Sequence, residues 1–165
     1  MVFFLVPDLW ITWVTLFAPW SGLMAWLASI AGSLGAVLTL HGLSATPGLD
    51  PLGWIVRIPG IGEGMIAAVE ARLAANGLPW TPWLIAGGIP LKVYAGVAFH
   101  QGLPLGDVLL WTLFARIVRI APTFLVVLVV RRLAAGTIDR RPVRWTALLV
   151  GCWSLFYLAY FLTMA

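Results

Sequence analysis

The sequence predicts an all-α integral membrane protein, and three observations support this. The chain of 165 residues is 62% hydrophobic and only 10% charged, and its mean hydropathy is +1.01. A soluble domain carries about 25% charged residues, so this chain has too few to cover a surface in water. It also has ten tryptophans, whose indole rings favour the headgroup boundary of a bilayer. The length allows a single membrane domain, residues 1–165, with three or so spanning helices.

Three apolar segments reach the roughly 20 residues that a spanning helix needs. They cover residues 22–41, 107–130 and 145–163. Asp107 suits the start of the second span, because a carboxylate there accepts hydrogen bonds from free N–H groups and favours the helix dipole. Pro122 should kink the same helix.

Two other apolar segments are interrupted and should enter the membrane without crossing it. Residues 2–20 contain Pro7-Asp8 and Pro19, and residues 80–103 contain Gly87-Gly88-Ile89-Pro90. Glycine and proline break helices, and broken backbone is tolerated at membrane depth only where protein or water covers it. We therefore expect two re-entrant hairpins, the second with both of its ends on one face of the membrane.

The segment between the first span and the second hairpin should lie outside the hydrocarbon core. Residues 42–60 are rich in Gly and Pro and predict a loop. Residues 61–75 place apolar side chains on one face and charged ones elsewhere, and Asn76-Gly77 is a good C-terminal cap. This pattern predicts an amphipathic helix at the membrane interface.

A stripe of small residues runs along the first span. Ala25, Ser29, Gly32 and Ala36 lie three or four residues apart and share one face of the helix. Small side chains allow helix backbones to approach closely in lipid, so we interpret the stripe as a helix-packing surface.

The basic residues are concentrated in one connector. The net charge is +4, but five of the nine arginines lie in residues 131–144, between two predicted spans. The positive-inside rule explains this distribution better than nucleic-acid binding does, and it places the connector in the cytoplasm with the C-terminus on the opposite side. The connector can also contact anionic lipid headgroups. We expect a multi-pass protein of a bacterial-type inner (cytoplasmic) membrane.

Two arginines lie in the second predicted span, where a charge is costly. At about 1.5 Å per residue, Arg116 and Arg119 are about 14 Å and 18 Å from the start of the helix, in a hydrocarbon core about 30 Å thick. Each must face protein or a wet cavity, since a charge there costs at least about 2.5 kcal/mol. They share a face with Thr112 and Thr123. We favour a functional role, with an anion or Asp8 in reach; the alternative is a structural ion pair with Asp8.

Lys92 and Asp8 each have two interpretations. Lys92, the sole lysine, follows Pro90 at the start of a predicted half-helix, where free N–H groups attract anions and the ammonium would complete a phosphate seat. A lysine that snorkels to the membrane interface explains it equally well. Asp8 either caps the helix that follows Pro7 or lies deep in the membrane and carries protons.

No motif indicates an enzyme, a metal site or a cofactor. Cys152 is the single cysteine, so no disulfide can form within one chain, and we expect it to be a core or lipid-facing residue. His41 and His100 are isolated and should be structural. The sequence has no cluster with metal-ligand spacing, no nucleophile elbow and no paired catalytic carboxylates.

Several short motifs resemble one membrane protein family. Residues 89–98, IPLKVYAGVA, resemble the proline, lysine and small residues of the YqaA-like branch of the DedA (VTT, SNARE-associated) family. Residues 115–119, ARIVR, resemble its paired arginines on the following helix. Pro7-Asp8 and residues 28–36 look like its proline–acid element and glycine-rich helix, so the resemblance extends to about residue 133. The chain has Asp8 and Ala115 where the family usually has Glu and Gly.

The resemblance implies two re-entrant hairpins that meet at a lipid pathway, and translocation of phospholipids or polyprenyl phosphate carriers. A scramblase- or flippase-like protein would use Arg116, Arg119 and Lys92 to hold the headgroup phosphate, with Asp8 coupling protons. The alternative is an accessory subunit packed into a larger membrane complex. The expected partners are membrane lipids, further copies of the chain or other membrane subunits, and no nucleic acid.

Overall fold

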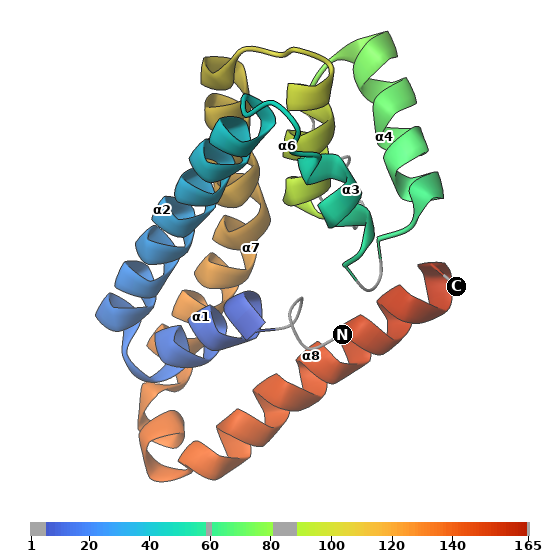
Figure 1. The fold of residues 1–165 in the computed structure, drawn as a ribbon. Helices are drawn as coiled ribbons and strands as arrows, with labels where there is room; N and C mark the ends of the chain where they lie inside the picture. Colours follow the sequence, from blue (N-terminus) through green and yellow to red (C-terminus); the bar gives the residue numbers. More distant parts are fainter. Residues whose placement is uncertain (1–5, 59–60, 81–88, 165) are drawn as a thin grey trace. The chain divides into compact units, whose positions relative to one another are not determined.

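The computed structural model describes residues 6–58, 61–80 and 89–164 (Figure 1). Within these ranges the chain is helical and contains no strand, which confirms the all-α prediction. Two helices, α2 (Pro19–Ser44) and α7 (Leu105–Arg140), have the length and composition of membrane spans. They contain the first two predicted spans, and α8 (Pro142–Met164) contains the third predicted span.

The first helix is short. Helix α1 (Val6–Phe17) has 12 residues, or about 18 Å, which is less than the hydrocarbon thickness. It turns into α2 through Ala18, whose N–H donates to the Val14 carbonyl oxygen at 2.7 Å. A Cβ on Gly22 would lie 2.7 Å from the Thr15 Cα, so the turn requires glycine there. The re-entrant hairpin at residues 2–20 includes residues outside the described ranges and stays a prediction.

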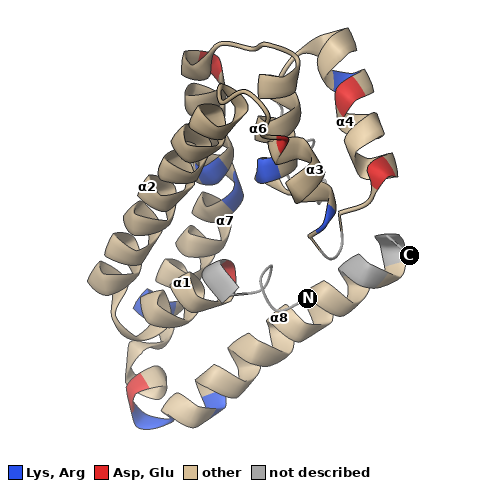
Figure 2. Ribbon diagram, in the orientation of Figure 1, with Lys and Arg blue, Asp and Glu red and all other residues tan. Residues whose placement is uncertain are grey.

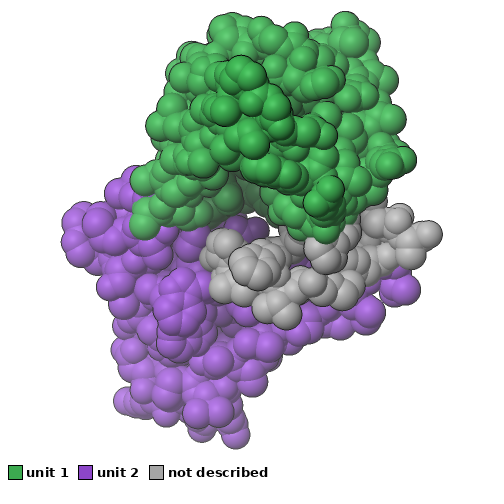
Figure 3. All heavy atoms as spheres, viewed as in Figure 1, with its two compact units in different colours: residues 1, 28–121 green, residues 2–27, 122–165 purple. Residues whose placement is uncertain are grey.

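The chain forms two compact units (Figure 3). Unit 1 contains residues 28–121, and unit 2 contains residues 2–27 and 122–165. The boundary divides α2 and α7, so each unit contains part of both long helices.

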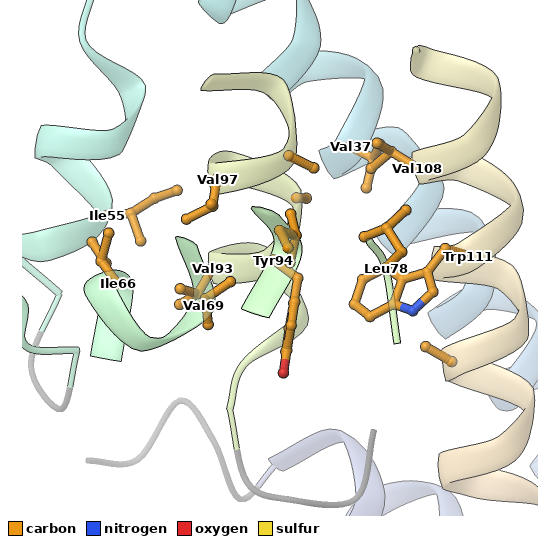
Figure 4. Close-up of a cluster of buried hydrophobic side chains, with 14 of the residues drawn as sticks. Val37, Ile55, Ile66, Val69, Leu78, Val93, Tyr94, Val97, Val108 and Trp111 are labelled. Atoms are coloured by element: carbon orange, nitrogen blue, oxygen red, sulfur yellow. The ribbon is translucent and has the colours of Figure 1, made fainter. Parts of the chain in front are cut away.

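The core of unit 1 is built around α6 (Leu91–His100) (Figure 4). Its side chains from Val93 to Ala98 are buried, and helices α3 (Pro51–Val56) and α4 (Glu63–Asn76) pack on it. Gly96 permits the contact with α3, because a Cβ there would lie 2.6 Å from the Ile55 Cδ1.

Two of the sequence predictions for this region need correction. The segment at residues 42–60 is not all loop: α2 continues to Ser44, and Asp50 caps α3 by accepting a hydrogen bond from the Gly53 N–H at 3.0 Å. The amphipathic helix is present as α4, but its apolar residues Ile66, Val69 and Leu73 are buried in the core of unit 1. Its apolar face therefore packs against protein and is not available to lipid.

The second interrupted segment is described only in part. Pro90 has extended backbone and α6 begins at Leu91, so no helix runs through Pro90. Gly87 and Gly88 lie outside the described residues, and the predicted re-entrant hairpin at residues 80–103 stays a prediction.

The arginine-rich connector is helical. Helix α7 continues to Arg140, and α8 begins two residues later at Pro142. The helix passes through Pro122, and the residue with non-helical backbone is Ala134 (φ −115°, ψ 17°). Arg131 and Asp139, on either side of Ala134, form an ion pair with an N–O distance of 2.6 Å. The connector is therefore a bent helical end, and its cytoplasmic location stays a prediction.

Unit 2 joins α1 to α8 through two reciprocal hydrogen bonds. The Trp13 indole N–H donates to the Thr146 Oγ1 at 3.2 Å, and the Trp153 indole N–H donates to the Thr12 Oγ1 at 3.0 Å. Each indole thus satisfies its polar atom within an apolar contact.

Candidate functional site

Unit 1 contains a cavity of about 340 Å³ between α2, α6 and α7. One wall comes from α2, a second from the start of α6, and the third from α7. The lining residues are Ser29, Gly32, Ser33, Ala36, Val37 and Leu40 of α2, Leu91, Lys92 and Ala95 of α6, and Thr112 and Arg116 of α7. Two cations and three hydroxyl-bearing residues therefore share one cavity, and the described residues that line it include no carboxylate.

The start of α6 and one face of α7 place the two cations. The extended backbone of Pro90 (φ −61°, ψ 136°) begins α6, so Lys92 lies in the first turn. Arg116 lies one turn after Thr112 on α7, and side chains four residues apart share a helix face. Both cations are half-buried, and Figure 2 shows blue segments on α6 and α7.

Ser33 holds Arg116 in a defined orientation. The Arg116 Nε donates to the Ser33 Oγ at 2.7 Å, and the Ser33 Oγ donates to the Ser29 carbonyl oxygen at 2.8 Å. The Ser33 proton is committed to the helix backbone, so a lone pair of the same oxygen faces the guanidinium. A charge-assisted bond through Nε restricts the rotation of the guanidinium plane.

Thr112 contributes a polar atom that the described residues do not satisfy. Its side chain is 2% exposed, and its Oγ1 has no hydrogen-bond partner among them. An unsatisfied buried hydroxyl costs about 1–3 kcal/mol. Thr112 lines the cavity, so a ligand oxygen that reached this hydroxyl would remove the cost. The hydroxyl of Tyr94 on α6 is also buried and without a partner in the described part of the chain.

Three of the four residues of the small-residue stripe, Ser29, Gly32 and Ala36, line the cavity. Among the described residues, no heavy atom lies within 4 Å of a Cβ built at Gly32, so the predicted close packing of another helix on this stripe is not seen at Gly32 within the described part of the chain. Gly32 and Ala36 are exposed, so the cavity opens to the surface of the unit along this wall. The short side chains leave space that a ligand can occupy.

Two further residues were predicted for the site. Arg119 is half-buried and is not among the described residues that line the cavity, which Lys92 and Arg116 share. Asp8 is part of unit 2, and its predicted pairing with the arginines stays a prediction.

The two histidines and the single cysteine do not form a metal site or another cluster among the described residues. His41 packs its ring against Phe99 with a centroid distance of 4.9 Å, while His100 is exposed. Cys152 is exposed on α8. Among the described residues, no group of three or more His, Cys, Asp or Glu side chains could hold a metal ion.

Sequence reasoning did not identify Ser33 as a site residue. The serine lies next to Gly32 in the small-residue stripe, and only the packing of α2 near α7 shows that it contacts Arg116. One signal was available, because a buried arginine requires hydrogen-bond acceptors and α2 offers serines at two positions one turn apart.

The arrangement suits an oxyanion. Guanidinium and ammonium groups both bind phosphate, the first through a planar fork and the second as a point charge. Comparisons of the chain with protein-family models, with curated proteins and with solved structures find no match.

Proposed function

We propose that this cavity binds the phosphate of a lipid headgroup and that the protein moves phosphate-bearing lipids across its membrane. The observation that carries the proposal is the meeting of Lys92 and Arg116 in one cavity with the unsatisfied Thr112 hydroxyl. A cavity lined by two cations favours an anion, and phosphate accepts hydrogen bonds from cations and hydroxyls alike.

The open wall of the cavity favours a lipid over a water-soluble anion. Gly32 and Ala36 are exposed on α2, a helix with the composition of a membrane span. If α2 crosses the bilayer, a headgroup could enter sideways while its acyl chains stay in hydrocarbon. The resemblance of residues 89–98 and 115–119 to the DedA family favours the same function. Arg119, one turn beyond Arg116, would bind the phosphate at a second position along its path. Asp8 would couple proton movement to lipid movement.

Lipid movement in liposomes tests the proposal. The purified full chain is reconstituted with a fluorescent phospholipid, and a membrane-impermeant reductant reports how fast label reaches the outer leaflet. Arg116→Leu should abolish protein-dependent movement, while Arg116→Lys keeps the fold and slows it. Arg57→Leu is the control, because Arg57 is an exposed arginine at the end of α3, outside the cavity. Unchanged movement in the Arg116→Leu, Arg119→Leu double variant would refute the proposal.

A second function, an accessory subunit of a larger membrane complex, is favoured by the exposed apolar surface of α8. The helix packs on α1, yet Leu148, Leu155, Phe156 and Leu158 are each more than half exposed. A subunit should co-purify with other chains in fixed stoichiometry in mild detergent. In that case the Arg116 variants would alter assembly without any effect on lipid movement by the isolated chain.

A further inference from the structure

Unit 2 contains a second cavity, separate in sequence and chemistry from the one in unit 1. It is a groove of about 470 Å³ between α1 and the start of α8. Trp13 and Phe17 form the α1 wall. The α8 wall consists of Pro142, Val143, Thr146, Ala147 and Val150.

The surface of this groove is apolar. Thr146 is the only lining residue with a polar group besides Trp13, and these two groups bond each other at 3.2 Å. Val143, Ala147 and Val150 recur at a spacing of three or four residues, which places them on one face of α8. The groove therefore offers mainly hydrocarbon contact.

Positive charge is concentrated where α7 ends and α8 begins (Figure 2), next to the groove residues Pro142 and Val143. Arg140, Arg141 and Arg144 are exposed where α7 ends and α8 begins. The one acid in residues 131–144, Asp139, is paired with Arg131, and the three arginines have no carboxylate partner among the described residues. Arg144 lies one turn before Ala147, at an angle of about 60° on the helix. The first turn of α8 has no acid to neutralise its positive dipole end.

We propose that this groove and the three arginines form a binding site for one anionic phospholipid. An acyl chain would occupy the groove, and the headgroup phosphate would bind Arg140, Arg141 and Arg144. The occupant needs both an apolar chain and a negative headgroup. A free anion would leave the groove empty, and a zwitterionic lipid would bring an ammonium group near the arginines. The positive-inside rule accounts for the arginines but requires no groove beside them.

Native mass spectrometry of the full-length protein in detergent tests this site. Protein is titrated with phosphatidylglycerol or with phosphatidylcholine of the same chains. One phosphatidylglycerol is expected to bind tightly in excess of the lipids that bind equally from both classes, which include any lipid held by the unit 1 cavity. Arg140→Gln, Arg141→Gln, Arg144→Gln should weaken its affinity at least tenfold, since each surface arginine contributes about fivefold. The double variant Arg57→Gln, Arg72→Gln removes exposed arginines of unit 1 and should bind like wild type.

The groove is tested separately from the charges. Ala147→Phe fills it and retains every arginine, so it should also weaken phosphatidylglycerol binding at least tenfold. If that variant does not fold, Val150→Phe on the same wall replaces it. The proposed site would be refuted if a folded groove variant bound phosphatidylglycerol as tightly as wild type, or if wild type bound both lipids equally. The arginines would then attract lipids only through non-specific surface charge. Arg116→Leu should leave phosphatidylglycerol binding at the groove unchanged. The groove can therefore be confirmed or refuted whether or not the protein moves lipids.

Discussion

Replacing Ser33 by alanine should weaken headgroup binding without removing either cation. The Ser33 hydroxyl accepts the Arg116 Nε–H at 2.7 Å, and a hydrogen bond to a charged group contributes about 1.5–3 kcal/mol. Because the site is half-buried and water can take the place of the serine oxygen, the lower end of that range applies. The affinity for a phosphate headgroup should therefore fall about tenfold.

Calorimetric titration of the detergent-solubilised protein with a short-chain phosphatidic acid measures this affinity, with every protein carrying Arg140→Gln, Arg141→Gln, Arg144→Gln so that the unit 2 groove does not contribute. Ser33→Thr keeps a hydroxyl and should restore most of it. Ser29→Ala is the matched control, because Ser29 lines the same cavity and contributes only its main-chain carbonyl to the Ser33 bond. Its affinity should stay within about twofold of wild type, well under the 1.4 kcal/mol of a tenfold change. Equal losses in Ser33→Ala and Ser29→Ala, or no rescue by threonine, would show that Ser33 does not orient Arg116.

Three further outcomes are expected. Thr112→Val removes the unsatisfied hydroxyl, so it should raise the free energy of unfolding of the ligand-free protein by about 1 kcal/mol and lower phosphate affinity, as thermal melts with and without ligand would show. Gly22→Ala should destabilise the protein by about 1–3 kcal/mol, because its Cβ would overlap the Thr15 backbone. Gly35→Ala is the control and should not destabilise it, because no heavy atom of the described residues lies within 4 Å of a Cβ built at Gly35. Equal melting temperatures of the two variants would contradict this prediction. Single cysteines in residues 131–144 should resist an impermeant thiol reagent applied from outside, while cysteines in the C-terminal tail should react; the reverse pattern would invert the topology.

Part of the candidate site could be predicted from the sequence, because a charged side chain in an apolar segment is costly. Lys92 and Arg116 stand out because a charge in an apolar segment requires a polar partner or water, and both line the cavity. The same reasoning applied equally to Arg119, three residues further along α7. The two side chains lie only about 60° apart around the helix axis, and only the packing of α2 and α6 decides which one lines the cavity.

Composition predicted secondary structure less well in residues 42–60, where helix-capping residues are mixed with glycines. Residues 42–60 predict a loop by their Gly and Pro content, yet Asp50 and Pro51 are a good cap and first residue for α3. The helix has only six residues, too short to stand out as a periodic pattern. It exists because Ile55 packs against Gly96 of α6, a contact far apart in sequence.

The two reciprocal bonds between α1 and α8 fix the register of that helix pair. Apolar side chains pack with little preference between neighbouring registers, and in lipid they gain little from being buried. Here each helix donates one indole N–H and accepts one, at Trp13–Thr146 and Trp153–Thr12. A slide of one helical turn, about 5.4 Å, would break both bonds at once and leave the two indole N–H groups without these acceptors in an apolar contact. The two bonds therefore hold the helix pair in one register. Replacing one of the two tryptophans should be tolerated best when the threonine that accepts its hydrogen bond is replaced as well.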